Sequence, residues 1–204
     1  MTKLILASKS ARRQEILQNL GVKFSILSRE VDESVPSEIT DPAETVCGLA
    51  ARKYYAVAGE AEPDSIIIAA DTIVALESGG KTEIFGKPRD LADAAYMLSS
   101  MSGKTHSVYT GLAVGSGDGT KLTVESVCTN VTFRSLTQAE IDYYINAESV
   151  LDKAGAYGIQ EYAGLFVSRI EGEYFNIVGL PVSRLSVILR DEFGVELYNF
   201  TEKK

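Results

Sequence analysis

The chain has 204 residues, of which 45% are hydrophobic, and its formal net charge at pH 7 is −8. This composition predicts an ordered protein with a substantial core, built as one large domain or as two small lobes. The acidic balance argues against broad binding of nucleic acid or anionic membranes, since both need a basic face. The sequence has no apolar run of about 18 residues and no basic-then-apolar leader, so we expect no membrane span, no signal peptide and a cytoplasmic location.

The cysteines and the histidine give little support for a metal site of their own. Cys47 and Cys128 are far apart, form no CxxC motif and lie in apolar patterns. We therefore expect small buried side chains rather than ligands or a disulfide. The single histidine, His106, excludes a histidine-rich metal site, and we expect it to have a structural or peripheral role.

The chain begins with a predicted strand, a polar turn and a helix. Residues 3–7 are mainly apolar, Ser8 and Ser10 lie in the turn, and Ser10 is the expected N-cap of a helix that ends at Gly21. In an α/β protein, such a strand–turn–helix unit commonly binds a ligand at the turn. We therefore expect the two serine hydroxyls to be close to a bound group.

Two arginines in the first turn of that helix indicate what the ligand is. The helix N-terminus carries partial positive charge, so Arg12 and Arg13 are disfavoured there unless an anion is bound. Guanidinium groups also match the geometry of phosphate oxygens. The turn therefore predicts a phosphate site, the alternative being a surface ion pair of one arginine with Glu15 or Glu30.

A second strand, an acidic loop and a helix are expected next. Residues 22–27 have the strand pattern, and residues 28–40 form a proline-containing loop that includes Glu33. A helix capped by Asp41 is predicted to run to residue 59, with Lys53 near its middle. Without further information, Lys53 could equally belong to a solvated helix face.

The most strand-like run covers residues 65–70 and leads into Asp71 and Thr72. The run ends at Asp71 and Thr72, and residues 73–76 continue the extended pattern before a turn at residues 78–80. A carboxylate at the end of an apolar strand is costly to bury unless it meets water, a cation or a metal. Asp71 is therefore a candidate metal ligand or general base, and the alternative is a capping or turn role.

The rest of the chain alternates helical and extended patterns. The expected elements are a helix capped by Asp90, a hairpin of strands at residues 107–114 and 122–134, a helix opened by a capping box at Thr137, a tight loop at residues 155–160, strands at residues 165–170 and 174–178, and a last helix from Pro181 to Gly194. No complete P-loop, GxSxG, HExxH or GxGxxG pattern is present. These absences argue against motor NTPases, serine esterases, zinc proteases and dinucleotide oxidoreductases.

Cations and carboxylates at element ends and in loops make up the remaining candidate site: Lys9, Arg12, Arg13, Lys53, Lys87, Glu33 and Asp71. Phosphoryl transfer needs cations, usually with Mg²⁺, to neutralise phosphates, and a carboxylate to hold metal or orient water. The residues alone therefore predict an enzyme that acts on a phosphate ester or a nucleotide.

Six motifs, in order along nearly the whole chain, carry a resemblance to a known family. They are residues 6–13 (LASKSARR), 70–72 (ADT), 86–88 (GKP), 102–111 (SGKTHSVYTG), 152–160 (DKAGAYGIQ) and 176–181 (NIVGLP). Together they resemble the successive signatures of the Maf family of nucleoside triphosphate pyrophosphatases. The resemblance implies a mixed α/β fold whose twisted sheet and flanking helices form two lobes around a deep cleft in a single domain, commonly a homodimer.

The resemblance also implies a reaction. The family cleaves a nucleoside triphosphate to the monophosphate and pyrophosphate with a divalent cation, Mg²⁺ or Mn²⁺, and the Tyr-Gly-Ile-Gln form is similar to the branch that prefers dTTP and UTP. By this analogy Asp71 matches the proton acceptor, whereas Arg12, Thr72 and Gln160 match positions linked to substrate choice. Gln160 offers a donor and an acceptor to a pyrimidine edge.

The family resemblance and the chemistry of the individual residues together give a working hypothesis for the site. Glu33 and Asp71 hold the metal, and Asp71 is either its ligand or the base that activates water. The groups expected to neutralise the triphosphate are Ser8, Ser10, Arg13, Lys53 and Lys87. The alternative function is a nucleotide-binding regulator of cell division that does not cleave its ligand.

Two positions depart from the family pattern. Ala11 replaces a proline, which makes the first turn slightly less rigid. Glu161 replaces a frequent glycine directly after Gln160. Because Glu161 is next to Gln160, the second departure concerns the residue expected to select the nucleobase.

Overall fold

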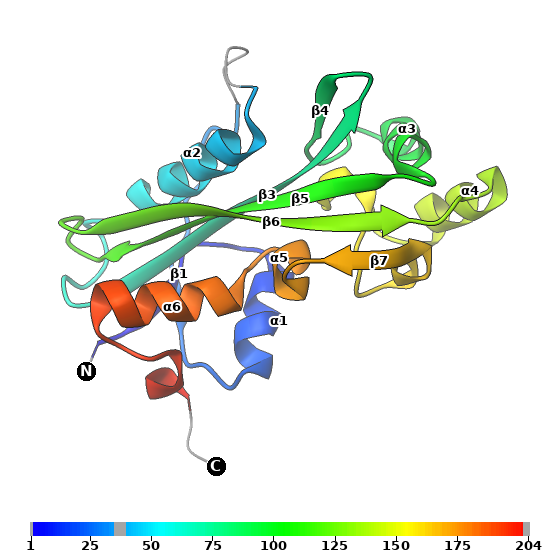
Figure 1. Ribbon diagram of the computed structural model, residues 1–204. Coiled ribbons are helices and arrows are strands. Elements are labelled where there is room, and N and C mark those ends of the chain that lie inside the picture. Colours follow the sequence, from blue (N-terminus) through cyan, green and yellow to red (C-terminus); the bar gives the residue numbers. More distant parts are fainter. Residues whose placement is uncertain (1, 35–39, 202–204) are drawn as a thin grey trace. The chain divides into compact units, whose positions relative to one another are not determined.

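A computed structural model of the chain describes residues 2–34 and 40–201 (Figure 1). Part of the loop predicted at residues 28–40 therefore lies outside the described residues. The chain divides into two compact units. Unit 1 comprises Met1–Asp71, Thr110–Val127 and Gly179–Lys204, and unit 2 comprises Thr72–Tyr109 and Cys128–Val178. The cleft and the single-domain organisation predicted above stay predictions.

A seven-stranded mixed sheet contains strands in the order β2-β1-β3-β5-β6-β7, with β4 paired to β3. The strands are β1 (Leu4–Leu6), β2 (Ser25–Ile26), β3 (Ile66–Ser78), β4 (Lys81–Phe85), β5 (Thr105–Ser116), β6 (Leu122–Phe133) and β7 (Val167–Glu171). Strand β1 is parallel to β2 and β3, whereas β4 pairs with β3, and β7 with β6, in antiparallel fashion. The predicted mixed α/β class with a twisted sheet is confirmed (Figure 1).

The α-helices of the described residues are α1 (Ala11–Asn19), α2 (Pro42–Tyr55), α3 (Leu91–Met101), α4 (Gln138–Ala147), α5 (Tyr174–Val178) and α6 (Val182–Phe193). Short 3₁₀ turns occur at η1 (Ala154–Ala156), η2 (Tyr162–Phe166) and η3 (Leu197–Phe200). The predicted caps of α2, α3 and α4 are confirmed, because Asp41, Asp90 and Thr137 each accept a hydrogen bond from a backbone N–H of the first turn. Helix α6 ends as predicted, with Gly194 in the left-handed conformation.

Several predicted boundaries are wrong. The run predicted at residues 65–70 and the extended segment predicted at residues 73–76 form one strand, β3, which continues through Asp71 and Thr72 to Ser78. The second strand is reduced to β2, and α2 ends at Tyr55 rather than at residue 59. The start of the strand predicted at residues 165–170 is instead a 3₁₀ turn, η2. Local pattern locates an element better than its ends, because tertiary contacts override the local preferences of the terminal residues.

The strand predicted at residues 174–178 is helix α5. The buried Asn176 amide donates hydrogen bonds to the carbonyl of Val108, at 2.9 Å, and to Oγ1 of Thr129, at 3.0 Å. These partners fix the segment in a single helical turn although its aromatic and β-branched residues favour a strand. The prediction for Cys128 is also wrong, because its side chain is exposed, whereas Cys47 is half-buried and both thiols are free.

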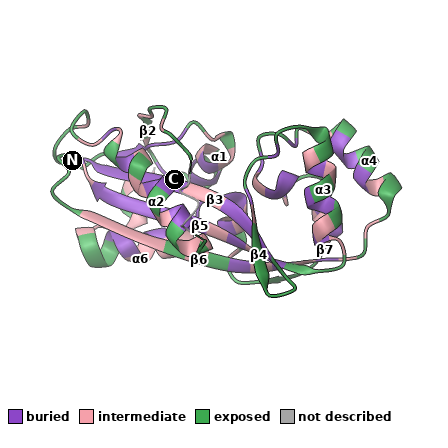
Figure 2. Ribbon diagram, turned by 90° about the horizontal axis from the view of Figure 1, so that it is seen from above, coloured by how far each residue is buried: buried purple, intermediate pink, exposed green. Residues whose placement is uncertain are grey.

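In unit 1, helix α2 covers one face of the strands and helix α6 covers the opposite face (Figure 1). Ala50 and Tyr54 of α2 pack against Ile5, Ile67 and Ala113 of the strands. Figure 2 shows the central strands as buried along this part of the sheet. The phosphate-binding candidates at the end of β1 are therefore attached to a rigid, covered strand.

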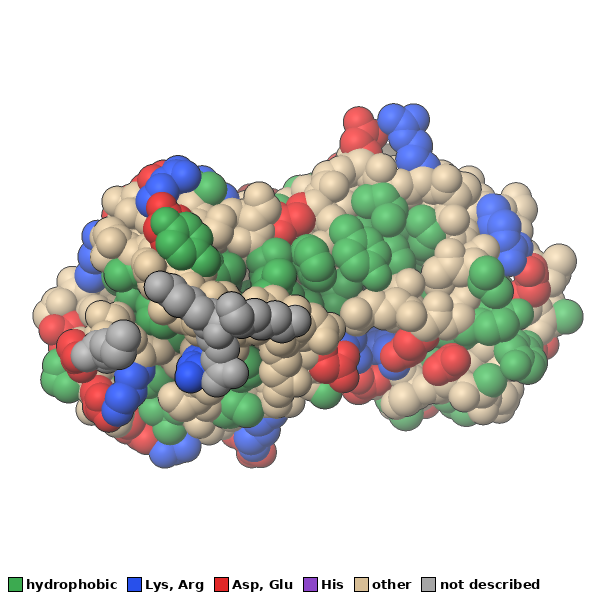
Figure 3. Space-filling model, turned by 90° about the horizontal axis from the view of Figure 1, so that it is seen from below, with side chains coloured by type: hydrophobic (Ala, Val, Ile, Leu, Met, Phe, Trp, Pro, Cys, Tyr) green, Lys and Arg blue, Asp and Glu red, His purple; other side chains and the backbone are tan. Residues whose placement is uncertain are grey.

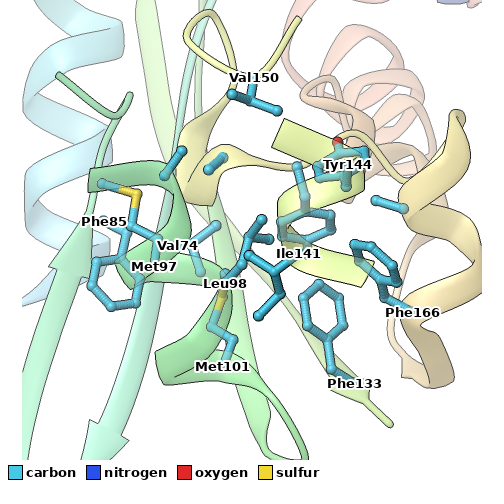
Figure 4. Close-up of a cluster of buried hydrophobic side chains, with 14 of the residues drawn as sticks. Val74, Phe85, Met97, Leu98, Met101, Phe133, Ile141, Tyr144, Val150 and Phe166 are labelled. Carbon is cyan, nitrogen blue, oxygen red and sulfur yellow. The ribbon is translucent and has the colours of Figure 1, made fainter. Parts of the chain in front are cut away.

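Unit 2 has a second hydrophobic core, which Figure 4 shows in close-up. Leu98 and Met101 of α3, together with Ile141 and Tyr144 of α4, pack around Phe133 of β6. Edge-to-face contacts between aromatic rings add to the stability of this core, since the ring centroids of Phe133 and Tyr157 are 4.9 Å apart. This core supports the loop that follows η1.

On the face displayed in Figure 3, basic and acidic side chains are interspersed rather than gathered by sign. Within the described parts of the chain, every helix is too short or too polar to cross a membrane.

Candidate active site

Helix α2, strand β3 and the acidic loop bring three of the predicted site residues together in unit 1. Nζ of Lys53 lies 2.8 Å from Oε1 of Glu33 and donates a hydrogen bond to Oδ1 of Asp71. The side chains of Lys53 and Asp71 are only 15% and 13% exposed. Lys53 is therefore not a solvated-face lysine, and both carboxylates converge on a single ammonium group.

The position of Asp71 follows from the strand that carries it. Residues 66–70 of β3 are fully buried, and burial first decreases at Asp71 and Thr72. A carboxylate placed among the preceding residues would lose its hydration without compensation. At position 71 it reaches the Lys53 ammonium instead, so the predicted end of the apolar run is correct even though the strand continues.

The turn between β1 and α1 forms a second part of the site, also in unit 1. The buried Oγ of Ser8 accepts hydrogen bonds from the Ser10 backbone N–H and from Nη1 of Arg13, each at 3.2 Å. Nε of Arg13 donates to the carbonyl of Gly179 at 2.7 Å. Burial lowers the pKa of the Arg13 guanidinium, and the negative charge of Asp71 opposes this decrease. Arg13 thus lies within the electrostatic field of the carboxylate cluster rather than in a surface ion pair.

The predicted N-cap position at Ser10 is confirmed, although the cap does not use the side chain. Ser10 occupies the N-cap position of α1, but its hydroxyl makes no capping hydrogen bond, and no acidic residue follows in the first turn. The first turn of α1 therefore lacks a side-chain acceptor at its cap. This arrangement suits an external anion, as predicted for the turn.

Three of the other predicted site residues belong to unit 2. Thr72 is half-buried, whereas Lys87 and Gln160 are exposed. The backbone N–H of Gly158 donates to Oη of Tyr144 at 3.1 Å, which holds the Gln160 loop against α4. The half-buried Arg12 belongs to unit 1.

Two carboxylate oxygens that share one cation are a donor set suited to a divalent ion. Magnesium prefers oxygen ligands and is commonly held by one or two carboxylates together with substrate phosphates and water. Among residues 2–34 and 40–201, no group of three or more His, Cys, Asp or Glu side chains could hold a metal without such help. Glu33 and Asp71 therefore fit a cation that takes its other ligands from phosphate and solvent.

Sequence reasoning missed three features of this region. It gave no role to Arg52, whose guanidinium contacts the backbone on both sides of Glu33. It also missed the support of Arg13 by Gly179, although the motif at residues 176–181 marked that segment. Finally, it did not anticipate the ion pair between the buried Lys153 and Glu161, for which the unusual residue after Gln160 was the available signal.

Comparison with known proteins identifies relatives over nearly the whole chain. A family model described as Maf-like protein matches residues 3–192. A protein of Alkaliphilus oremlandii named dTTP/UTP pyrophosphatase is 46% identical over 197 residues, which cover 97% of this chain and 100% of the relative. Proteins with the same name from Bacillus anthracis (48% identical; 97% and 98% covered) and Clostridium novyi (44% identical; 96% and 100% covered) are similar. The resemblance stated from the motifs is thereby confirmed.

Proposed function

The chain belongs to the Maf family, and from this we propose that it is a nucleoside triphosphate pyrophosphatase that hydrolyses dTTP and UTP. The structural observation that carries the proposal is the convergence of Glu33 and Asp71 on the Lys53 ammonium, in the unit that also contains the turn proposed to bind phosphate. The name shared by the relatives supports the same substrates.

In the proposed reaction, water adds to the α-phosphorus, and the bond from that phosphorus to the bridging oxygen of the β-phosphate breaks. The products are the nucleoside monophosphate and pyrophosphate. Negative charge increases on the departing pyrophosphate, so catalysis requires fixed cations and hydrogen-bond donors around it. The groups proposed to supply them are Ser8, Ser10, Arg13, Lys53 and Lys87.

Asp71 is proposed to hold or accept the proton of the attacking water, or to share a divalent cation with Glu33. Mg²⁺ or Mn²⁺, when bound, would neutralise phosphate oxygens and make a coordinated water more acidic. Lys53 keeps the two carboxylates side by side, because its ammonium offsets their mutual repulsion. Its low exposure strengthens that interaction.

Choice of nucleobase is proposed to depend on Arg12, Thr72 and Gln160. The Gln160 amide can donate and accept at once, and the edge of uracil or thymine presents alternating carbonyl and N–H groups. A site that pairs with both kinds of group disfavours bases that leave one of them unsatisfied.

We further propose that the protein acts in the cytoplasm, as a homodimer, with the whole chain as one domain. Its net charge of −8 supports a small-molecule substrate rather than nucleic acid or an anionic membrane as the partner.

The test is pyrophosphate release from dTTP, UTP, CTP, ATP, GTP and 7-methyl-GTP, with Mg²⁺, with Mn²⁺ and with a chelator. We expect metal-dependent cleavage that is fastest for dTTP and UTP. Nucleotide binding without any cleavage would instead support the regulatory alternative.

A matched pair of variants ties this activity to the site. Asp71→Asn is expected to lower kcat by about 100-fold or more. Glu62→Gln, which removes an exposed ion pair with Lys3 in the same unit, is expected to leave kcat unchanged. Near-normal turnover by Asp71→Asn would refute both roles proposed for this residue.

A further inference from the structure

Arg52 and Lys53 are neighbours in the last turn of helix α2, and both contact the segment that contains Glu33. The exposed Arg52 guanidinium donates through Nη1 to the carbonyl of Asp32, at 3.1 Å, and to the carbonyl of Ser34, at 2.6 Å. These two carbonyls belong to the residues on either side of Glu33. Arg52 thus holds the backbone of the residue whose side chain pairs with Lys53.

The segment needs such support because it has no helix or strand of its own. Residues 28–34 lack regular secondary structure, and the Glu33 side chain is 47% exposed. Packing therefore restrains this carboxylate much less than that of Asp71, which β3 holds rigidly at 13% exposure.

A local turn adds to the restraint. The Asp32 carboxylate accepts hydrogen bonds from the backbone N–H and from the hydroxyl of Ser34, both at 2.8 Å. Those bonds shape the turn, but they do not connect it to the rest of the unit. Arg52 makes this connection to α2, the helix that also presents Lys53.

We propose that Arg52 is a positioning residue that fixes Glu33 beside Asp71, so that the two carboxylates are presented together to a divalent cation. This inference rests on the proposed function, in which both carboxylates hold that cation. The planar guanidinium suits the role, because its several N–H groups point in fixed directions, whereas a lysine ammonium provides a single centre.

The direct test compares Arg52→Ala with Arg29→Ala. Alanine favours the helix at least as well as arginine, so α2 itself is retained. Arg29 is the matched control, because it is an exposed arginine of the same loop that pairs with Glu60 rather than with Asp32 or Ser34. A third variant, Arg52→Lys, is expected to recover part of the function lost in Arg52→Ala.

Two measurements report on the role. Binding of Mn²⁺ to the protein in complex with a non-hydrolysable dTTP analogue, followed by electron paramagnetic resonance, is expected to weaken by about tenfold in Arg52→Ala and to remain unchanged in Arg29→Ala. The Mg²⁺ concentration for half-maximal pyrophosphate release is expected to rise by a similar factor. A Glu33→Gln background should abolish the effect of Arg52→Ala, because the arginine acts only through that carboxylate.

The outcomes separate this inference from the function on which it rests. If Glu33→Gln is impaired but Arg52→Ala matches the wild type in both measurements, the positioning role is refuted while the pyrophosphatase assignment stands. If Glu33→Gln binds Mn²⁺ and cleaves dTTP like the wild type, the proposed metal site is refuted, and the role of Arg52 with it. Additive effects of the two substitutions would also refute the positioning role.

Discussion

Oε2 of Glu161 lies 3.1 Å from Nζ of Lys153, a lysine whose side chain is only 4% exposed. The same ammonium donates a hydrogen bond to the carbonyl of Ser149. A buried ammonium needs such partners because it has lost most of its hydration. Glu161, one of the two residues that depart from the family pattern, therefore completes the support of the loop that carries Gln160.

We expect Glu161→Gln to lower the free energy of unfolding by about 1 kcal/mol, because a half-exposed partner of a buried charge is neutralised. Asp152→Asn is the control, since this carboxylate is 54% exposed and lies 3.3 Å from the same ammonium. Urea denaturation measures both changes. Equal effects of the two substitutions would contradict a special contribution of Glu161.

A buried histidine gives the stability of unit 2 a defined dependence on pH. Burial lowers the pKa of His106 to about 4, and Nε2 of its ring lies 2.9 Å from Oη of Tyr157. In the unfolded chain the pKa is near its ordinary value of about 6.5. Between these values the unfolded state binds more protons, so stability decreases as the pH falls from about 7 to about 4.

The expected loss for this one group is about 3 kcal/mol at most over that range. Because His106 is the only histidine of the chain, the His106→Gln variant should lack this component entirely. Free energies of unfolding at a series of pH values, for the wild type and the variant, measure the difference. A ring-proton NMR titration that gave an ordinary pKa in the folded protein would contradict the prediction.

Sequence reasoning succeeded where a feature depends on a few adjacent residues. The cap at Thr137 requires only its own hydroxyl and a glutamate three positions later, and both are visible in the sequence. It failed for α5, where Asn176 is held by Val108, 68 positions away in the chain. The local pattern of that segment favours a strand, and only the folded chain supplies the competing partners.

The candidate site divides in the same way. The two arginines predicted an anion from the sequence, because their conflict with the helix dipole is local. The partner of Arg13 at Gly179 is 166 positions away and is a backbone carbonyl, so no side-chain pattern announces it. Distances between Lys53 and the two carboxylates likewise depend on the packing of α2 against the sheet.

Helix α2 crosses strand β5 so closely that one glycine is required. A Cβ built on Gly111 would lie 2.0 Å from the carbonyl oxygen of Val46, a backbone atom of the helix. Since the backbone cannot yield locally, we expect Gly111→Ala to destabilise the protein by about 3 kcal/mol. The helix would also shift, and Lys53 with it, so kcat should decrease as well.

Gly48, in the middle of the same helix, is the control for that substitution. A Cβ there meets nothing within 4 Å, so Gly48→Ala should raise stability by about 0.5–1 kcal/mol through helix propensity. Thermal and urea denaturation of the two variants measure the opposite signs. Destabilisation by both would mean that α2 is constrained along its whole length.

The carbonyl of Gly179 that accepts the Arg13 hydrogen bond has a backbone conformation suited to glycine, with φ of 114°. We expect Gly179→Ala to cost about 1–3 kcal/mol of stability through backbone strain. Relief of that strain would turn the carbonyl away from Nε of Arg13. The guanidinium would then be less well oriented toward a phosphate, and KM for dTTP should rise by about tenfold.

Gly194→Ala separates strain from positioning. This glycine has φ of 66° at the exposed end of α6, and its replacement should cost about 1 kcal/mol without any change in KM. Steady-state kinetics at a temperature where both variants are fully folded makes the comparison. A KM increase confined to Gly179→Ala would support the positioning of Arg13 by Gly179, because strain alone is present in both variants. Equal KM values would indicate that Arg13 finds its orientation from Ser8 and the helix without the Gly179 carbonyl.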